Sequence, residues 1–104
     1  MQYGRLKKNG DFQKLFKKGK RVFSPVLTVI YSPCRESTVM GIALSKKHGK
    51  AVVRNRIKRL IRAAFSVNTD KLNGNYSLVI MPKIAESYDY KSIEKSLISC
   101  FKRM

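Results

Sequence analysis

Acidic residues are scarce in this chain. Its 104 residues include 6 Asp and Glu against 23 Lys and Arg, which gives a formal net charge of +17 at pH 7. A small domain with such an excess of one sign repels itself and favours a polyanionic partner, above all a nucleic acid. A membrane surface is the alternative at this level, because basic amphipathic segments also bind anionic lipids.

Cysteine and long apolar runs are also in short supply. The two cysteines, Cys34 and Cys100, are too few for a disulfide scaffold, which favours reduced thiols in a cytoplasmic protein. The longest apolar runs are far shorter than the roughly 18 residues of a membrane span. Hydrophobic residues make up 43% of the chain, enough for a packed core. We expect a single domain over residues 1–104, with residues 1–8 as a flexible basic tail.

The sequence lacks the motifs of common catalytic sites. His48 is the single histidine and no Cys-x-x-Cys pair exists, so a zinc site is not expected. The six acids are scattered, and no Gly-Lys-Ser/Thr phosphate loop is present. We therefore expect no catalytic residue and no protein-bound metal in this chain. Any part in catalysis would come from binding and positioning.

Positive charge is concentrated in the first 62 residues, which hold 17 basic and 2 acidic residues. Two blocks carry most of it. The first block comprises Arg5, Lys7, Lys8, Lys14, Lys17, Lys18, Lys20 and Arg21; the second comprises Lys46, Lys47, Lys50, Arg54, Arg56, Lys58, Arg59 and Arg62. A solvated surface normally mixes both signs, so blocks of one sign favour a phosphate-binding face.

Hydrophobic spacing and turn residues predict alternating helices and strands. Helices are expected at about 9–19, 50–67 and 89–101, and strands at 21–23, 26–31, 38–44 and 76–81. The predicted order is α-β-β-β-α-β-α. This order indicates an α+β fold, a single-domain α/β sandwich with helices on a four-stranded sheet.

The helix at about 50–67 is the most informative segment. Val53, Ile57, Leu60, Ile61 and Ala64 fall on one face at 100° per residue. The opposite side carries an i+4 column of Lys50, Arg54, Lys58 and Arg62, with Asn55 and Arg59 beyond it and Arg56 at the edge of the apolar stripe. Like charges at this spacing repel by a few tenths of a kcal/mol per pair, a cost that bound phosphates would offset.

The partner of this helix is better matched by RNA than by DNA. A recognition helix in the DNA major groove would be expected in a helix-turn-helix context, whereas strands surround this helix. A-form RNA or a single strand suits a basic sheet-and-helix surface with aromatic side chains. Asn55 can donate and accept hydrogen bonds, which suits a base edge or a 2′-OH, although a merely tolerated polar residue is the alternative.

The first helix offers a second candidate site. Phe12 and Phe16 alternate with Lys14, Lys17 and Lys18, so aromatic and cationic groups are interleaved. The two rings either belong to the core or line a groove for unpaired nucleotides. Tyr31 could join such a groove, but a shift of one residue in strand register would place it on the opposite face.

The segment from Ser45 to Arg62, SKKHGKAVVRNRIKRLIR, closely resembles the signature of the bacterial ribonuclease P protein component family. Arg5-Leu6-Lys7-Lys8 with Asp11-Phe12 and Phe16, and also Ser24-Pro25, resemble other parts of the same family. The last 30 residues match mainly in length and apolar pattern. The resemblance therefore covers essentially the whole chain.

This resemblance implies a catalytic RNA as partner. In that family the RNA carries out the Mg²⁺-dependent removal of the 5′ leader from precursor tRNA, and the protein binds the ribozyme and the single-stranded leader. The Mg²⁺ of the holoenzyme is then held mainly by RNA. The protein is expected as a monomer within the ribonucleoprotein. The runner-up is a small ribosomal or rRNA-binding structural protein of the same build.

The resemblance also implies roles for particular residues. The ribozyme-binding set is Lys46, Lys47, Lys50, Arg54, Asn55, Arg56, Lys58, Arg59 and Arg62. The leader cleft is expected between the first helix and the sheet, lined by Phe12, Phe16, Lys17 and Tyr31; family members often carry an aromatic residue where this chain has Ile30. The family fold further implies a left-handed crossover through the basic helix, against the right-handed form that chain physics favours in about 98% of cases.

Overall fold

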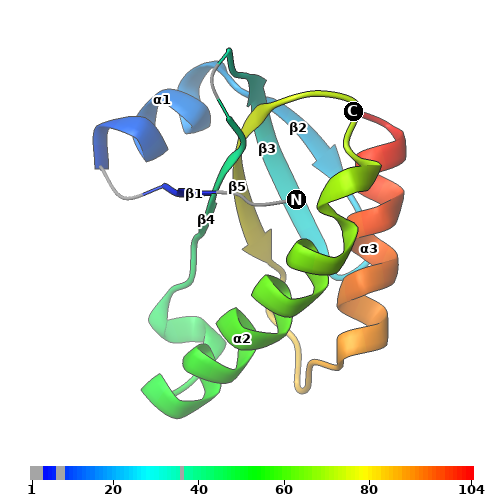
Figure 1. Ribbon diagram of the computed structural model, residues 1–104. Helices are drawn as coiled ribbons and strands as arrows, with labels where there is room; N and C mark the ends of the chain where they lie inside the picture. Colours follow the sequence, from blue (N-terminus) through cyan, green and yellow to red (C-terminus); the bar gives the residue numbers. More distant parts are fainter. Residues whose placement is uncertain (1–3, 7–8, 36) are drawn as a thin grey trace.

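The chain folds into three helices and a mixed sheet (Figure 1). The structure is a computed structural model that describes residues 4–6, 9–35 and 37–104. The helices are α1 (Asn9–Lys18), α2 (Ala51–Asn68) and α3 (Tyr90–Lys102). The strands are β1 (Gly4–Arg5), β2 (Lys20–Phe23), β3 (Leu27–Pro33), β4 (Val39–Ile42) and β5 (Tyr76–Pro82), and single 3₁₀ turns lie at η1 (Lys46–His48) and η2 (Thr69–Lys71). The predicted α+β class and the order of its seven elements are confirmed.

The sheet has five strands in the described residues, one more than the sequence predicted. Their order is β1-β4-β5-β3-β2, with β1, β4 and β5 parallel and the other pairs antiparallel. The additional strand is β1, where Gly4 pairs with Val39 and Arg5 with Met40. The prediction of a tail over residues 1–8 therefore does not hold at Gly4–Arg5; residues 1–3 and 7–8 lie outside the described part.

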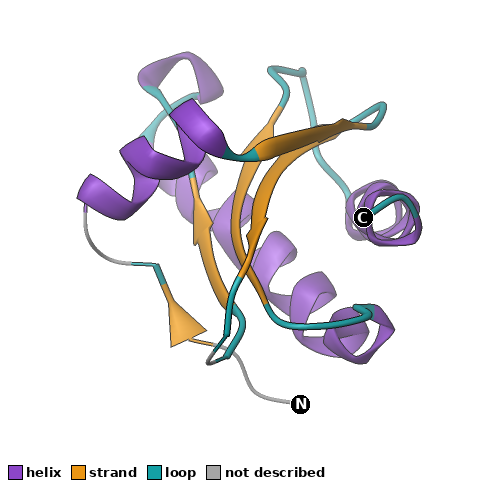
Figure 2. Cartoon of the chain, turned by 90° about the horizontal axis from the view of Figure 1, so that it is seen from above, coloured by secondary structure: helices purple, strands orange, loops and turns teal. Residues whose placement is uncertain are grey.

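Helices cover the two faces of the sheet unequally. Figure 2 shows α1 alone on one face, with α2 and α3 on the other. The larger buried cluster lies between the sheet and α2 and α3, and includes Ile57 and Ile61 of α2 and Leu97 of α3. A smaller cluster of Leu15, Ile30 and Val79 lies under α1. Each such side chain contributes about 1.5–3 kcal/mol on burial, so most of the apolar stabilisation comes from the α2–α3 side.

The connection from β4 through α2 to β5 joins two adjacent parallel strands. Both strands run downward in Figure 1 while α2 runs upward beside them, and Figures 1 and 2 together show that this crossover is left-handed. Connections of this kind are right-handed in about 98% of cases. The handedness expected from the family resemblance is therefore the one observed.

The end of α2 is tied to α3 by a buried polar group. Asn68 donates from Nδ2 to the carbonyl of Ala64 (2.8 Å) and to Glu94 Oε2 (3.0 Å), while its Oδ1 accepts from Lys71 Nζ (2.6 Å). The start of α3 is capped by Asp89, whose pKa is lowered by hydrogen bonds from Ser92. These contacts fix the two helices against each other beneath the sheet.

Both cysteines lie in the described part of the chain. Cys34 is half-buried and Cys100 is buried, and both are free thiols. Burial raises the pKa of the Cys100 thiol. In the part of the chain that the structure describes, no helix is long and apolar enough to cross a bilayer.

Candidate nucleic-acid interface

Helix α2 separates its apolar and cationic residues as the sequence predicted, except that Val53 of the predicted apolar stripe is 41% exposed in the first turn. Ile57, Ile61 and Ala64 are buried against the sheet and α3. On the remaining sides, Arg54, Lys58 and Arg62 are partly buried along their length, while Lys50, Asn55, Arg56 and Arg59 are exposed. Lys50 is the N-cap residue just before the helix, and the first turn contains no acid. The helix therefore presents a nearly continuous cationic face.

Most carboxylates lie outside the cationic face of α2. The acidic residues with described side chains, Asp70, Glu86, Asp89 and Glu94, all come after α2 in the chain. Glu86 lines a hollow together with Arg56, at the edge of the apolar stripe. The cationic face therefore keeps the charge that a phosphate backbone would meet.

The loop before α2 is held in place by the lone histidine. His48 Nδ1 accepts a hydrogen bond from the backbone N–H of Ser45 (3.0 Å), and Nε2 lies 2.7 Å from the carbonyl oxygen of Pro82. Because a carbonyl only accepts, Nε2 carries the proton and the ring is the neutral tautomer. His48 thereby fastens the 3₁₀ turn that carries the exposed Lys46 and Lys47 to the end of β5. Sequence reasoning assigned it no such role.

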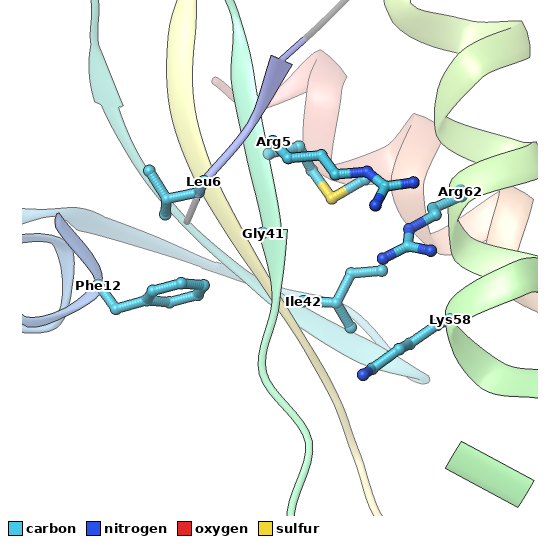
Figure 3. Close-up of a pocket in the computed structure, with 8 residues that line it drawn as sticks. Arg5, Leu6, Phe12, Gly41, Ile42, Lys58 and Arg62 are labelled. Atoms are coloured by element: carbon cyan, nitrogen blue, oxygen red, sulfur yellow. The ribbon is translucent and has the colours of Figure 1, made fainter. Parts of the chain in front are cut away.

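A pocket of about 210 Å³ connects the cationic face with the other side of the sheet. It surrounds the edge of β4 at Gly41 and Ile42. Figure 3 shows Phe12 on one side of this strand, and Arg5, Lys58 and Arg62 on the other. Arg5 and Arg62 extend their guanidinium groups toward the same space. Strand β1 thus adds Arg5 to the predicted set, a residue that the resemblance did not assign.

Phe12 lies between the core and the groove, the two positions that the sequence left open. Its side chain is half-buried and packs at the margin of the cluster formed by Leu15, Ile30 and Val79. A Cβ atom at Gly41 would lie 2.6 Å from Phe12 Cζ, so the ring rests directly on the backbone of β4. A larger residue at this position would force the Phe12 ring to shift.

Phe16 and Lys17 are more open to solvent. Phe16 is 36% exposed, Lys17 is exposed, and the backbone carbonyl of Phe16 accepts a hydrogen bond from the guanidinium of Arg21 at 3.4 Å. On another side of α1, a groove of about 500 Å³ is lined by Lys14 and Lys18 of the helix and by polar residues of the sheet, including Ser32 and Ser77. The α1 face therefore carries aromatic and cationic groups side by side; Lys7 and Lys8 lie outside the described residues.

The placement of Tyr31 in a groove with Phe12 and Phe16 is wrong. Tyr31 packs on the α2–α3 side and makes an edge-to-face contact with Tyr76, with ring centroids 5.6 Å apart and an interplanar angle of 82°. Its neighbour Ile30 lies on the α1 side. Successive residues of a strand point to opposite faces, so the register of β3 decides which of the two meets α1.

One aromatic residue on the α1 side was missed. Val22 is buried in the larger cluster, so Arg21 and Phe23, its neighbours in β2, point to the other face. Phe23 is 59% exposed. The alternation around Val22 is the signal that could have located it, but a strand of four residues is too short to fix its faces from sequence.

Comparison with known proteins gives one family. The family model described as Ribonuclease P matches residues 2–104. The chain is 40% identical to the ribonuclease P protein component of Fusobacterium nucleatum, covering 93% of each chain, and 41% identical to that of Clostridium kluyveri, covering 99% of this chain and 96% of the relative. Among solved structures, the RNase P protein from Thermotoga maritima superposes with a TM-score of 0.86 at 27% identity, covering 96% of each chain.

Proposed function

The chain belongs to the ribonuclease P protein family, and from this premise we propose that it binds the catalytic RNA of the holoenzyme and the 5′ leader of precursor tRNA. The observation that carries the proposal is the cationic face of α2, which continues around the edge of β4 to the aromatic α1 face. A folded RNA and a single strand could thus be held at the same time. Its setting is the cytoplasm, without a membrane partner.

The cationic face is proposed to grip the ribozyme. It consists of Lys46, Lys47, Lys50, Arg54, Asn55, Arg56, Lys58, Arg59 and Arg62. Arginine can bind a phosphate through two parallel hydrogen bonds, and lysine supplies a point charge. Arg54 Nε is buried without a hydrogen-bond partner among the described residues, so a rotation of this side chain toward RNA would gain a bond.

The α1 face is proposed to hold the leader. Phe12 and Phe16 offer ring surfaces for unpaired bases, and Lys17 offers charge for the backbone between them. Stacking of a base on an aromatic side chain contributes about 1–3 kcal/mol and tolerates any base. This tolerance suits a leader whose sequence differs from one precursor to another.

The bond cleavage itself is assigned to the RNA. When bound, Mg²⁺ would supply the activated water and the stabilisation of charge for phosphodiester hydrolysis. The described residues offer no cluster of three His, Cys, Asp or Glu side chains, so the donors in this part of the chain do not fit a protein-only metal site. The residues of this chain bind and orient the two RNAs and reduce the repulsion between them.

Reconstitution tests the proposal. Protein and ribonuclease P RNA together should cleave precursor tRNA at the mature 5′ end in Mg²⁺, and the protein alone should not. Affinity for the ribozyme should fall steeply with salt, with a log–log slope of about −0.7 to −0.9 per neutralised phosphate. Arg56→Ala should weaken ribozyme assembly.

Three results would contradict the proposal: robust cleavage by the protein without RNA, a flat salt response, or unchanged assembly by the Arg56 variant. RNA that copurifies at moderate salt separates the proposal from a role in the ribosome. A ribozyme of intermediate length supports the proposal, whereas rRNA alone would favour the ribosomal alternative. Binding to anionic vesicles that RNA does not compete away would favour a lipid surface instead.

A further inference from the structure

Phe23 is a large apolar side chain in an unusual position. It is 59% exposed at the end of β2, on the face that α1 covers only in part. Its backbone is well anchored, because its carbonyl accepts a hydrogen bond from Arg103 and the following turn is closed by the Ser24 N–H bonded to the Leu27 carbonyl (3.0 Å). An exposed ring on a fixed backbone loses little freedom when it binds a ligand.

The strand registers place Phe23 beside the proposed leader site. Arg21 pairs with Ile30 and Ile30 with Val79, which gives the row of residues that α1 covers. Phe23 pairs with Thr28, and Thr28 with Met81, which gives the next row on the same face. Adjacent rows on one face are about 6.6 Å apart along the strands, so Phe23 lies one row beyond the residues that α1 covers.

The positive charge around Phe23 indicates which kind of ligand would bind there. Arg21 lies on the same face of β2 as Phe23, and its guanidinium donates to the Phe16 carbonyl (3.4 Å) beside Lys17 of α1; both cations are exposed. A second copy of a chain with a net charge of +17 would be repelled by this surface. A single-stranded nucleic acid supplies both the complementary charge and the flat bases that stack on a phenyl ring.

We infer that Phe23 is a third stacking residue for the unpaired leader, and that it extends the surface formed by Phe12 and Phe16. The inference rests on the proposed function, since it names a further residue of the same site. The third aromatic of this groove comes from β2, because β3 turns an isoleucine toward α1.

Affinity measurements on the reconstituted holoenzyme test the inference. Phe23→Ala should weaken binding of leader-bearing precursor by about 5- to 150-fold, the range expected for one lost base stack, and leave mature tRNA binding unchanged. Phe23→Tyr should retain the affinity. Ile84→Ala is the matched control, because Ile84 is 56% exposed in the connection after β5, and it should have no effect.

The outcomes separate this inference from the proposed function. If Phe16→Ala weakens leader binding and Phe23→Ala does not, the inference fails and the proposed leader site stands. If Phe23→Ala weakens leader-bearing and mature tRNA equally, the inference also fails. If neither variant shows any dependence on the leader, the proposed leader site is itself overturned. A loss of self-association in the Phe23 variant, with RNA binding intact, would assign the residue to a protein interface.

Fluorescence gives an independent readout, because the chain contains no tryptophan. Phe23→Trp introduces a single indole whose emission should be quenched when a base of the leader stacks on it. Leader-bearing precursor should quench it in the holoenzyme, and mature tRNA should not. An Ile84→Trp variant should respond to neither RNA. Equal emission of the Phe23→Trp protein with both RNAs would overturn the inference.

Discussion

The two faces of the sheet differ in what covers them. On the α2–α3 side, two long helices bury a continuous apolar cluster, and polar groups such as Asn68 are satisfied by neighbouring side chains and backbone. On the α1 side, one short helix covers a small cluster and leaves Phe16 and Phe23 in contact with solvent. The α2–α3 side, here called the closed face, therefore provides stability. This allows the α1 side, the open face, to keep apolar surface for a ligand.

Removing the cationic column should have the largest effect. The triple variant Arg54→Ala, Lys58→Ala and Arg62→Ala should lower ribozyme affinity and flatten its salt dependence by about 2–3 in log–log slope, since up to three phosphates lose their partners. The matched control removes Lys91, Lys95 and Lys102 from α3, an equal loss of charge on exposed positions. Titration of the ribozyme across salt concentrations measures both. If the two triple variants lost the same ribozyme affinity, α2 would contribute through the net charge of the protein and not through a specific contact.

The open face is addressed by Phe16→Ala. Loss of this ring should weaken the binding of leader-bearing precursor by about 1–3 kcal/mol, because a stacked base loses its partner. Assembly with the ribozyme should stay intact. Val67→Ala, which truncates an exposed residue of α2, serves as control. Competition binding of precursor and mature tRNA gives the measurement. Should both RNAs lose affinity to the same degree, the leader would not lie on this face.

The closed face is addressed by Asn68→Ala. The substitution should lower the free energy of unfolding by about 1–3 kcal/mol, because it leaves buried partners on α2 and α3 without their hydrogen bonds. Asn55→Ala on the exposed side of the same helix should change stability little and RNA affinity more. Denaturant unfolding measures the first quantity. If Asn68→Ala and Asn55→Ala had similar free energies of unfolding, the link between α2 and α3 would contribute little to stability.

Tyr31→Phe should have the smallest effect, and it tests whether the Tyr31 hydroxyl contacts the leader. The ring contact with Tyr76 survives without the hydroxyl, and the side chain lies on the closed face. Leader-dependent affinity should therefore equal that of the unmodified protein in the same competition assay. A selective loss of leader binding would show that Tyr31 reaches the leader and would remove the distinction between the two faces.

Periodicity made the helical part of the fold predictable. The apolar stripe of Ile57, Ile61 and Ala64 recurs over several turns, and a pattern of that length specifies both the element and its buried side. The cationic set followed from the same spacing, together with a family signature that covers the loop before the helix. The handedness of the crossover came from the resemblance alone, because the general rule favours the opposite hand.

Short strands set the limit of prediction. Tyr31 and Ile30 are both apolar enough for either face of β3, so the sequence did not determine which one meets α1. Gly4–Arg5 carries no alternation at all, and β1 forms only because the edge of β4 is open beside it. Phe23 was missed because a strand of four residues does not fix its faces from sequence, and the position of Arg5 beside Arg62 depends on the pairing of β1 with the distant strand β4.

The attachment of β1 has a consequence for solution experiments. Two backbone hydrogen bonds flank Arg5, from the Gly4 N–H to the Thr38 carbonyl (2.9 Å) and from the Leu6 N–H to the Met40 carbonyl (3.1 Å). Amides in so short a ladder open by local fluctuation, whereas those in the middle of the sheet require far more of the molecule to open. A phosphate held by Arg5 and Arg62 would slow deuterium uptake at Gly4 and Leu6. These two amides would therefore report occupancy of the pocket without an attached probe.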